Sequence, residues 1–208
     1  MEITIHRTLN KDNFGEVIPD IFRFSYLMID GGEMKEAVYC TATHMLQSND
    51  GCFFTITHND KKIAYGVFSY GLNNRNVRRL YYFAVEREHR QSGLGTKALK
   101  LAMETEVNID HGCTVACQPE LRVFYEKVGF KYYSTAIKRD HEIVLAYFNE
   151  DKMSIKECVE QIICLVEIQP ESIEIFSKIK SFLKEHGIRP PKNTPNKKIQ
   201  VTPTAHLI

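Results

Sequence analysis

The hydrophobic pattern at the start of the chain has a period of two over one short segment and helical spacing over the next two segments. Glu2 to Thr8 alternates between apolar and polar side chains, which predicts an edge strand. Apolar residues next recur at helical spacing over residues 12–28 and again over 33–47, and we expect one helix in each range. Pro19 lies inside the first range and is expected to weaken that helix or split it.

The hydrophobic period then falls to two. Three strands are predicted, over residues 52–57, 62–70 and 77–86. Short polar turns separate them, the first of which is His58-Asn59-Asp60-Lys61. Strands joined in this way predict an antiparallel meander.

Helices and strands alternate after the meander. The expected elements are a helix over 96–107, a strand over 113–117, a helix over 120–128, and strands over 132–138 and 142–148. Pro119 suits the first turn of the second of these helices, and Gly129 is expected to end it as a left-handed cap. This region completes a domain that we expect to span residues 1–149.

The chain changes character near residue 150. Ser154 and Glu157 form a capping box before an apolar helical stripe, and a second stripe ends at Gly187. These stripes predict a helical hairpin over 150–187. Residues 188–208 are rich in proline and basic residues and contain no acidic residue, so we expect a flexible tail.

Composition excludes several classes of protein. The 208 residues contain 27 Lys and Arg against 26 Asp and Glu, a net charge of +1, which argues against a surface built throughout to hold nucleic acid or anionic membrane. No apolar run approaches the roughly 20 residues of a membrane span. The N-terminus lacks the pattern of a secretory signal. We therefore expect a cytoplasmic protein without a membrane partner.

The six cysteines show no CxxC pairing. Cys113 and Cys117 share one face of a predicted strand near His111, an arrangement in which a metal site is conceivable. Half-buried free thiols in a reducing compartment are the expected state, and no metal is expected.

The most informative stretch is Arg90-Gln91-Ser92-Gly93-Leu94-Gly95, which follows the third meander strand and opens a helix. A glycine-bearing turn and the free N–H groups of a helix N-terminus form a cradle for an anion such as phosphate. Glycine lets the phosphate approach the backbone. Arg90 and Lys97 are expected to add positive charge.

Two other phosphate-binding signatures match this stretch less well. Gly93 to Ala98 fits the dinucleotide fingerprint, with Asp110 at a suitable distance, but that fingerprint belongs after a first parallel strand. Here the stretch follows an antiparallel meander. The P-loop pattern fails, because one residue alone separates the two glycines before Thr96 and Lys97.

The order of elements and two motifs resemble the GNAT acetyltransferase superfamily. Arg90 to Gly95 match its [R/Q]-x-x-G-x-[G/A] hallmark, and Phe124 to Phe130 are similar to its F-Y-E-K-x-G-F segment. The resemblance covers about residues 2–148. It implies an α+β fold in which helices flank a central mixed, mostly antiparallel sheet.

The resemblance implies acetyl-coenzyme A as the donor of an acetyl group. It assigns Tyr125 as the general acid that protonates the departing thiolate, a role suited to a phenol with a reference pKa near 10. It implies that the backbone of Phe83 and Val85 pairs with the pantetheine arm. The cofactor-binding residues that it implies are Phe83, Val85, Arg90, Gln91, Ser92, Gly93, Leu94, Gly95, Thr96 and Gln118. Gln118, Leu121 and Arg87 stand where the family often carries Asn, Ala and Pro.

The sequence does not identify the residue that acts as the general base. Strand alternation places Tyr81 and Tyr82 on opposite faces, so at most one of them is expected to face the cleft. The other candidates, each also explained as surface or packing residues, are Asp30, Glu33, Glu86, His89 and His141.

Two functions of different class follow. The first is an N-acetyltransferase in which a primary amine of a small molecule, a protein or an aminoacyl-tRNA attacks the thioester directly. The second is a coenzyme A-binding regulatory or interaction module. The basic tail, with Arg75, Arg78 and Arg79, adds nucleic acid as a weakly supported acceptor or partner. The hairpin is expected to cover an apolar face or to form a homodimer.

Overall fold

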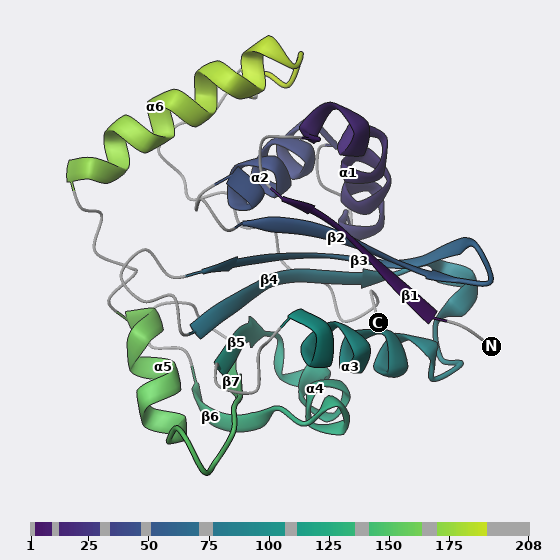
Figure 1. The fold of residues 1–208 in the computed structure, drawn as a ribbon, viewed down its shortest axis with the longest axis vertical. Helices are drawn as coiled ribbons and strands as arrows, with labels where there is room; N and C mark the ends of the chain where they lie inside the picture. The colour runs from purple at the N-terminus through teal and green to yellow at the C-terminus, as the bar shows by residue number, and fades with distance from the viewer. Residues whose placement is uncertain are drawn as a thin grey trace.

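The computed structural model describes residues 3–9, 13–29, 34–46, 51–70, 77–106, 112–135, 142–163 and 170–190. Within these residues the chain forms one seven-stranded sheet in the order β1-β2-β3-β4-β5-β7-β6 (Figure 1). The strands are β1 (Ile3–Leu9), β2 (Cys52–His58), β3 (Lys61–Tyr70), β4 (Val77–Val85), β5 (Gly112–Cys117), β6 (Lys131–Thr135) and β7 (Ile143–Tyr147).

The sheet is mixed and mostly antiparallel, as the resemblance implied. Strands β1 to β4 form an antiparallel run that contains the predicted meander, β4 and β5 are parallel, and β5, β7 and β6 are antiparallel. The β2–β3 hairpin turns through Asn59 and Asp60, whose φ angles of 49° and 62° are both left-handed. Two such residues close a hairpin whose twist matches its strands.

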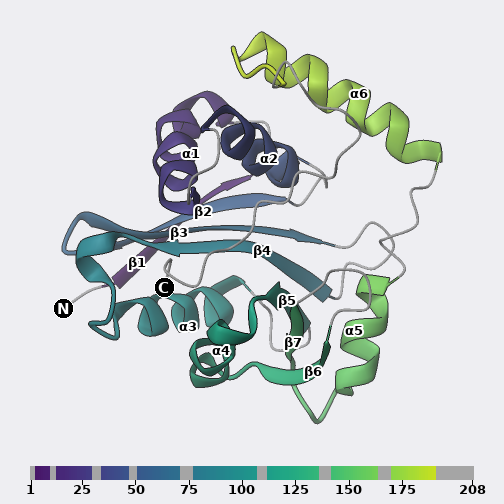
Figure 2. The same cartoon turned by 180° about the vertical axis from the view of Figure 1, so that it is seen from behind.

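Helices cover both faces of the sheet (Figures 1 and 2). One face carries α1 and α2, and the other carries α3 and α4. The helices are α1 (Phe14–Met28), α2 (Met34–Leu46), α3 (Leu94–Glu106), α4 (Arg122–Val128), α5 (Ile155–Ile163) and α6 (Pro170–Glu185), with short 3₁₀ turns η1 (Arg87–His89) and η2 (Pro119–Leu121). No helix in the described ranges is long and apolar enough to cross a membrane.

Helix α1 continues through Pro19, so the proline does not split the helix. Pro19 lies near the start of the helix and costs the hydrogen bond that its nitrogen would have donated to Gly15. The helix keeps an apolar stripe that is fully buried at Ile21 and Phe24. Burial of that stripe outweighs the lost hydrogen bond.

Strand β4 contains a bulge at Tyr81. Val67 of β3 pairs with Tyr82 and the next residue, Phe68, pairs with Leu80, so Tyr81 has no partner of its own. Tyr81 and Tyr82 both pack on the α1/α2 side of the sheet, whereas Leu80 belongs to the core on the α3/α4 side. The expectation that the two tyrosines face opposite sides is therefore wrong, because a bulge inserts one residue and breaks the alternation.

Strands β4 and β5 pair over a short length and then separate. Val77 to Leu80 pair with Gly112 to Val115, and no pairing continues from Tyr81 onward within the described residues. The bulge bends β4 at the same point. The edge of β4 between Tyr81 and Val85 is therefore open toward β5.

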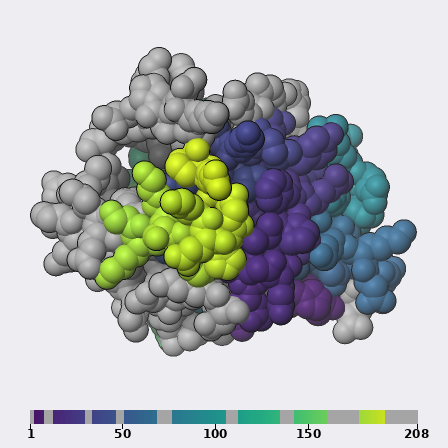
Figure 3. Space-filling view, turned by 90° about the horizontal axis from the view of Figure 1, so that it is seen from above, coloured from purple at the N-terminus to yellow at the C-terminus, as the bar shows by residue number. Residues whose placement is uncertain are grey.

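The helices after residue 150 pack on different parts of the domain. Ser154 caps α5 as predicted: its N–H donates to Glu157 Oε2 at 2.8 Å, and its Oγ accepts from the Glu157 N–H at 3.2 Å. Cys158 of α5 packs near Val77 and Ala146. Helix α6 instead lies against α1 and α2 (Figure 3). The two helices expected as a hairpin thus bury their apolar stripes against separate partners.

The end of α6 differs from the expected start of a tail. Gly187, with φ of 78°, ends the helix, and the Ile188 N–H donates to the Leu183 carbonyl at 2.8 Å. Ile188 is buried with the α1/α2 cluster. The remainder of the predicted tail, residues 191–208, lies outside the described residues.

Candidate active site

The predicted anion cradle lies between β4 and α3. Gln91 and Gly93 have φ angles of 60° and 80°, so two left-handed residues occur within three positions. Such a turn directs successive N–H groups toward one point and forms a concavity for an anion. In the described part of the chain, no backbone carbonyl accepts from the N–H groups of Gln91, Gly93, Gly95 or Thr96. The motif thus forms a left-handed turn at the start of a helix, and anion binding by its amides stays a prediction.

Side-chain contacts hold the cradle in shape. Ser92 Oγ donates to the His89 carbonyl at 2.6 Å and accepts from the Leu94 N–H at 3.3 Å. The Lys97 N–H donates to the Gly93 carbonyl at 3.2 Å, which is the first bond of α3. Because Ser92 is engaged within the turn, its backbone rather than its hydroxyl is oriented for a ligand.

Gly95 has a role that sequence reasoning did not anticipate. A Cβ atom at Gly95 would lie 2.9 Å from Cγ2 of Val85, which is too close for van der Waals contact. The second glycine therefore lets α3 pack directly on the end of β4. At Gly93 the space is open, and the left-handed backbone requires the glycine.

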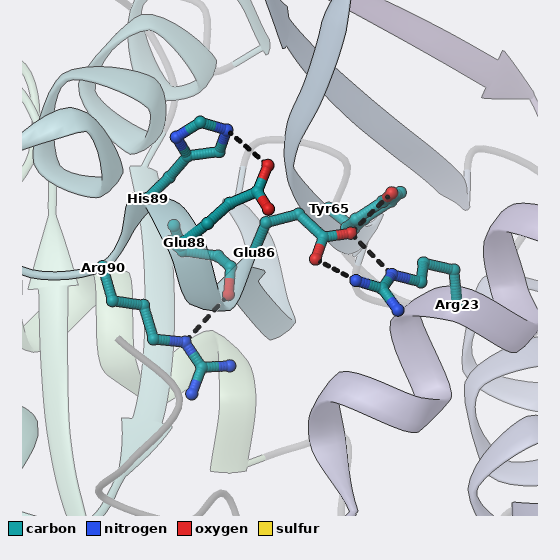
Figure 4. A network of polar contacts seen from close by, with 7 residues as sticks. Arg23, Tyr65, Glu86, Glu88, His89 and Arg90 are labelled. Atoms are coloured by element: carbon teal, nitrogen blue, oxygen red, sulfur yellow. Dashed lines mark hydrogen bonds and ion pairs between the residues drawn. The ribbon is translucent and has the colours of Figure 1, made fainter.

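Arg90 ties the cradle to β4. Its Nε donates to the Val85 carbonyl at 3.0 Å, and its side chain is half-buried (Figure 4). Burial, together with the nearby charge of Arg87, lowers the pKa of the Arg90 guanidinium from its ordinary value. Arg90 is thus held along the strand that leads into the cradle.

Glu86 belongs to an ion-pair network, which the sequence did not indicate. Both of its oxygens accept from Arg23 of α1, at 2.7 and 2.5 Å, and Oε1 also accepts from the Tyr65 hydroxyl at 3.1 Å (Figure 4). Burial would raise the pKa of Glu86, but the hydrogen bond and charge of Arg23 and the Tyr65 hydrogen bond outweigh it and lower the pKa. A carboxylate held in this way is a poor proton acceptor.

The other base candidates are placed differently. His89 Nε2 lies 3.4 Å from Glu88 Oε1, in the 3₁₀ turn that precedes the cradle (Figure 4). Asp30, Glu33 and His141 lie outside the described residues.

The open edge of β4 presents the backbone of the two residues implied to bind pantetheine. The Glu86 N–H donates to the Ile63 carbonyl of β3 at 2.8 Å, so Glu86 and Ala84 direct their peptide groups toward β3. Alternation directs those of Phe83 and Val85 to the opposite edge, toward β5. The Val85 carbonyl already accepts from Arg90.

Tyr125 lies in the core on the α3/α4 side of the sheet, near the Cys113 and Cys117 thiols of β5. It is 4% exposed and belongs to one cluster with Leu80 of β4 and Val115 of β5. Burial first, and then the nearby thiols of Cys117 and Cys113, raise the pKa of its phenol. Its hydroxyl makes no hydrogen bond within the described residues. Tyr125 is therefore a protonated donor at neutral pH.

The cap of α4 fixes the Tyr125 ring. Gly129 is left-handed, with φ of 115°, and the Phe130 N–H donates to the Tyr125 carbonyl at 3.1 Å. The Phe130 ring then meets the Tyr125 ring edge-on at 5.4 Å. Phe124 stacks on Phe83 of β4 at 6.2 Å. The segment thus packs Phe124 on β4 and holds the Tyr125 ring between Phe124 and Phe130.

The remaining predicted residues lie at the end of β5. Gln118 precedes η2, is half-buried, and accepts the Leu121 N–H at 3.0 Å through its carbonyl. Cys113 and Cys117 are buried, and burial raises the pKa of both thiols, that of Cys117 to about 12. Such thiols are poor nucleophiles. His111 lies outside the described residues, and within those residues no group of three metal-ligating side chains comes together.

A second polar cluster lies on the opposite, α1/α2 side of β4. His44 of α2 places Nδ1 2.9 Å from the Cys40 carbonyl oxygen and 3.2 Å from the Tyr82 hydroxyl. Cys40 Sγ lies 3.3 Å from that hydroxyl. The His44 ring also lies 4.4 Å from the Tyr81 ring. Sequence reasoning missed His44, because the bulge that brings both tyrosines to it leaves no periodic signal.

These features agree with comparisons to known proteins. Residues 49–132, from β2 into β6, match the family model of the acetyltransferase (GNAT) domain. The matched span, which includes the cradle and Tyr125, is thus similar to a GNAT acetyltransferase domain. No curated protein matches the chain.

Solved structures show the same fold. An acyl-CoA N-acyltransferase from Pseudomonas aeruginosa has a TM-score of 0.51 at 12% identity, over 70% of this chain and 99% of that one. A spermidine N-acetyltransferase chimera from Vibrio cholerae and hSSAT has a TM-score of 0.55 at 12% identity, over 73% and 98%. An aminoglycoside acetyltransferase in complex with coenzyme A has a TM-score of 0.51 at 13% identity, over 72% and 96%.

Proposed function

We propose that this protein is an N-acetyltransferase that moves an acetyl group from acetyl-coenzyme A to a primary amine. The observation that carries the proposal is the alignment of three features along β4. An amide cradle lies at its end, an open backbone edge precedes the cradle, and a buried, protonated phenol lies in the core on the α3/α4 side of the sheet.

Acetyl-coenzyme A fits this arrangement. Its pyrophosphate is an anion that the amides from Gln91 to Thr96 would hold at the N-terminus of α3. Its pantetheine arm carries amides that would pair with the Phe83 and Val85 backbone on the open edge. Gln118, at the end of β5, would face the same cleft. Bound in this way, acetyl-coenzyme A supplies an acetyl group activated as a thioester.

The chain then has two tasks in the transfer. A primary amine is mostly protonated at neutral pH, with a reference pKa of about 10.4 for lysine, and must lose a proton before or during attack. Tyr125 donates its proton to the sulfur as the carbon–sulfur bond breaks and the carbon–nitrogen bond forms. The amine attacks directly, since the described buried thiols are poor nucleophiles.

The alternative is a module that binds coenzyme A without turnover. The enzyme is favoured because the Tyr125 hydroxyl makes no hydrogen bond within the described residues, which leaves its proton for a ligand. The acceptor is a primary amine of a small molecule, a protein or an aminoacyl-tRNA. Two structural neighbours carry the names of enzymes that act on spermidine and aminoglycosides, and these amines are suitable first probes.

The test measures coenzyme A release from acetyl-coenzyme A with spermidine, an aminoglycoside, peptides with a free α-amine, and aminoacyl-tRNA. Tyr125→Phe should lower kcat about 10²- to 10⁴-fold and leave the Kd of coenzyme A nearly unchanged. Tyr147→Phe is the matched control, because Tyr147 also packs on Phe130 but lies on β7. Binding of coenzyme A without release on any amine would favour the module.

A further inference from the structure

On the proposed function, we infer that His44 is the group that takes the proton from the attacking amine. His44 lies on α2, outside both motifs. The inference follows from its position relative to the bulge in β4, from the tautomer that its contacts impose, and from the side of the sheet that it occupies.

The bulge marks where the acetyl group should lie. An extended arm that starts at the cradle and follows β4 backward from Val85 to Tyr81 covers four residues, or roughly 13 Å at about 3.3 Å per residue. At Leu80 the strands β4 and β5 rejoin, so the open edge ends there. The acyl end of the arm therefore reaches the bulge, whose two tyrosines contact His44.

The acid and the base then act from opposite sides of the sheet. Tyr125 lies with the α3/α4 core, and Tyr81 and Tyr82 lie with the α1/α2 core. A thioester between β4 and β5 would have the phenol on one side and the His44 cluster on the other. The sulfur can be protonated from the first side while an amine enters from the second.

The contacts of His44 define which ring nitrogen is basic. A carbonyl oxygen accepts hydrogen bonds and cannot donate them, so Nδ1 must carry the hydrogen that bridges 2.9 Å to the Cys40 carbonyl. In the neutral ring, Nε2 then holds the lone pair. The Tyr82 hydroxyl oxygen, 3.2 Å from Nδ1, can accept from the same N–H.

The same tautomer argues against Cys40 as a nucleophile. Cys40 Sγ lies 3.5 Å from His44 Nδ1, but that nitrogen already carries a proton and cannot accept one from the thiol. The titratable and charged groups near the ring include Cys40 on α2 and Tyr81 and Tyr82 on β4, with Arg79 over the Tyr81 ring at 4.9 Å.

The proton balance is complete with these groups. The ammonium first loses one proton to solvent. The neutral amine nitrogen then bonds to the acetyl carbon and gives a second proton to His44 Nε2. The carbon–sulfur bond breaks, and the sulfur receives the Tyr125 proton. His44 then releases its proton to solvent, and Tyr125 regains one from solvent. The products are the N-acetyl amine and free coenzyme A, with no oxidant or reductant needed.

The decisive variant is His44→Asn. The Asn side-chain amide can still donate toward the Cys40 carbonyl, but it has no basic nitrogen. We expect kcat with the best amine of the panel to fall about 10²- to 10⁴-fold, with the Kd of coenzyme A and the Tm close to wild type. Wild-type kcat/KM should rise with pH through the deprotonation of an imidazole and also through that of the substrate amine, and the variant should keep the rise from the amine alone.

His186→Asn is the matched control. His186 Nδ1 lies 3.0 Å from the Phe182 carbonyl, which is the same i to i−4 arrangement, and its ring also packs on aromatic side chains. It lies at the end of α6, away from β4. We expect His186→Asn to leave kcat and the pH profile unchanged.

A second measurement does not depend on turnover. Nitrogen chemical shifts of ¹⁵N-histidine protein should show the Nδ1–H tautomer for neutral His44, with its signal assigned through its loss in His44→Asn. The Nε2–H tautomer would overturn the inference. Normal turnover and an unchanged pH profile in His44→Asn would also overturn the inference. The same holds if Cys40 becomes acetylated and Cys40→Ala loses turnover. No turnover by the wild type on any amine would overturn the proposed function and this inference together.

Discussion

Arg23 and Glu86, 63 residues apart in the chain, form a two-point ion pair that joins α1 to the end of β4. Glu86 is the residue that directly precedes η1 and the cradle. The side chain of Glu86 is 9% exposed and that of Arg23 is 48% exposed, so the carboxylate is the buried partner. The pair thus connects the helix on one side of the sheet to the loop that we propose holds pyrophosphate.

Removing Arg23 should loosen the cradle. Arg23→Met keeps the aliphatic stem but leaves the buried Glu86 carboxylate with the Tyr65 hydrogen bond alone. We expect a loss of about 1–3 kcal/mol in unfolding free energy and a weaker Kd for coenzyme A. Urea unfolding and calorimetric titration measure the two effects. Lys62→Met, which removes the exposed Lys62–Asp20 pair, should cost at most about 1 kcal/mol and leave coenzyme A binding unchanged.

The same ion pair predicts a pH dependence of stability. Because the folded pKa of Glu86 is lowered, the folded state binds fewer protons than the unfolded chain at acidic pH. Its contribution is complete above the unfolded value of about 4.3 and is lost as the pH falls through the folded pKa. The difference in unfolding free energy between wild type and Glu86→Gln should therefore shrink from pH 7 to pH 3. A difference that grows with acid would contradict the assignment.

Gly95→Ala should weaken coenzyme A binding through packing. The new Cβ would lie 2.9 Å from Val85 Cγ2, so α3 must move away from β4 and carry the cradle with it. We expect a higher Kd for coenzyme A with a lower Tm.

Val85→Ala supplies the control for that variant, because it removes the colliding methyl group. The double variant of Gly95→Ala and Val85→Ala should recover coenzyme A affinity relative to Gly95→Ala alone.

Gly93→Ala tests the other glycine. The Cβ of the new alanine would meet no atom within 4 Å, but the residue must hold φ near 80°. The resulting backbone strain should lower the unfolding free energy by about 1–2 kcal/mol. Val85→Ala should not restore that loss.

Leu183→Ala tests whether α6 is part of the folded domain. Leu183 is fully buried in the cluster that contains Phe14 of α1. Its truncation should cost about 2–5 kcal/mol in a single cooperative unfolding transition. The exposed neighbour Lys184 is the control, and Lys184→Ala should stay within about 0.5 kcal/mol of wild type. A separate early transition for α6 would show instead that the helix unfolds on its own.

The cradle and Tyr125 could be predicted because their signals are local. Gly93 and Gly95 lie in a strand–turn–helix that a few consecutive residues define, and Gly129 and Phe130 fix the Tyr125 helix from the next turn. The meander could be predicted for the same reason, since its turns are short and its strands alternate.

The missed features depend on residues that are distant in the chain. Nothing near Glu86 indicates that Arg23 will neutralise it. The bulge at Tyr81 arises from the pairing of β4 with β3, so alternation alone placed the two tyrosines wrongly. The helices α5 and α6 each have a readable stripe, but the stripe does not say which surface will cover it.

The position of α6 decides where a shortened version of this protein can end. A fragment that stops at residue 149, after the last strand of the sheet, would lack Phe182 and His186, whose rings pack on Phe14, and the buried Leu183. Helices α1 and α2 would then present an uncovered apolar surface on the side where we propose the amine enters. An expression fragment for crystallisation or assay should therefore extend at least to Pro190, and shorter ones should be prone to aggregation.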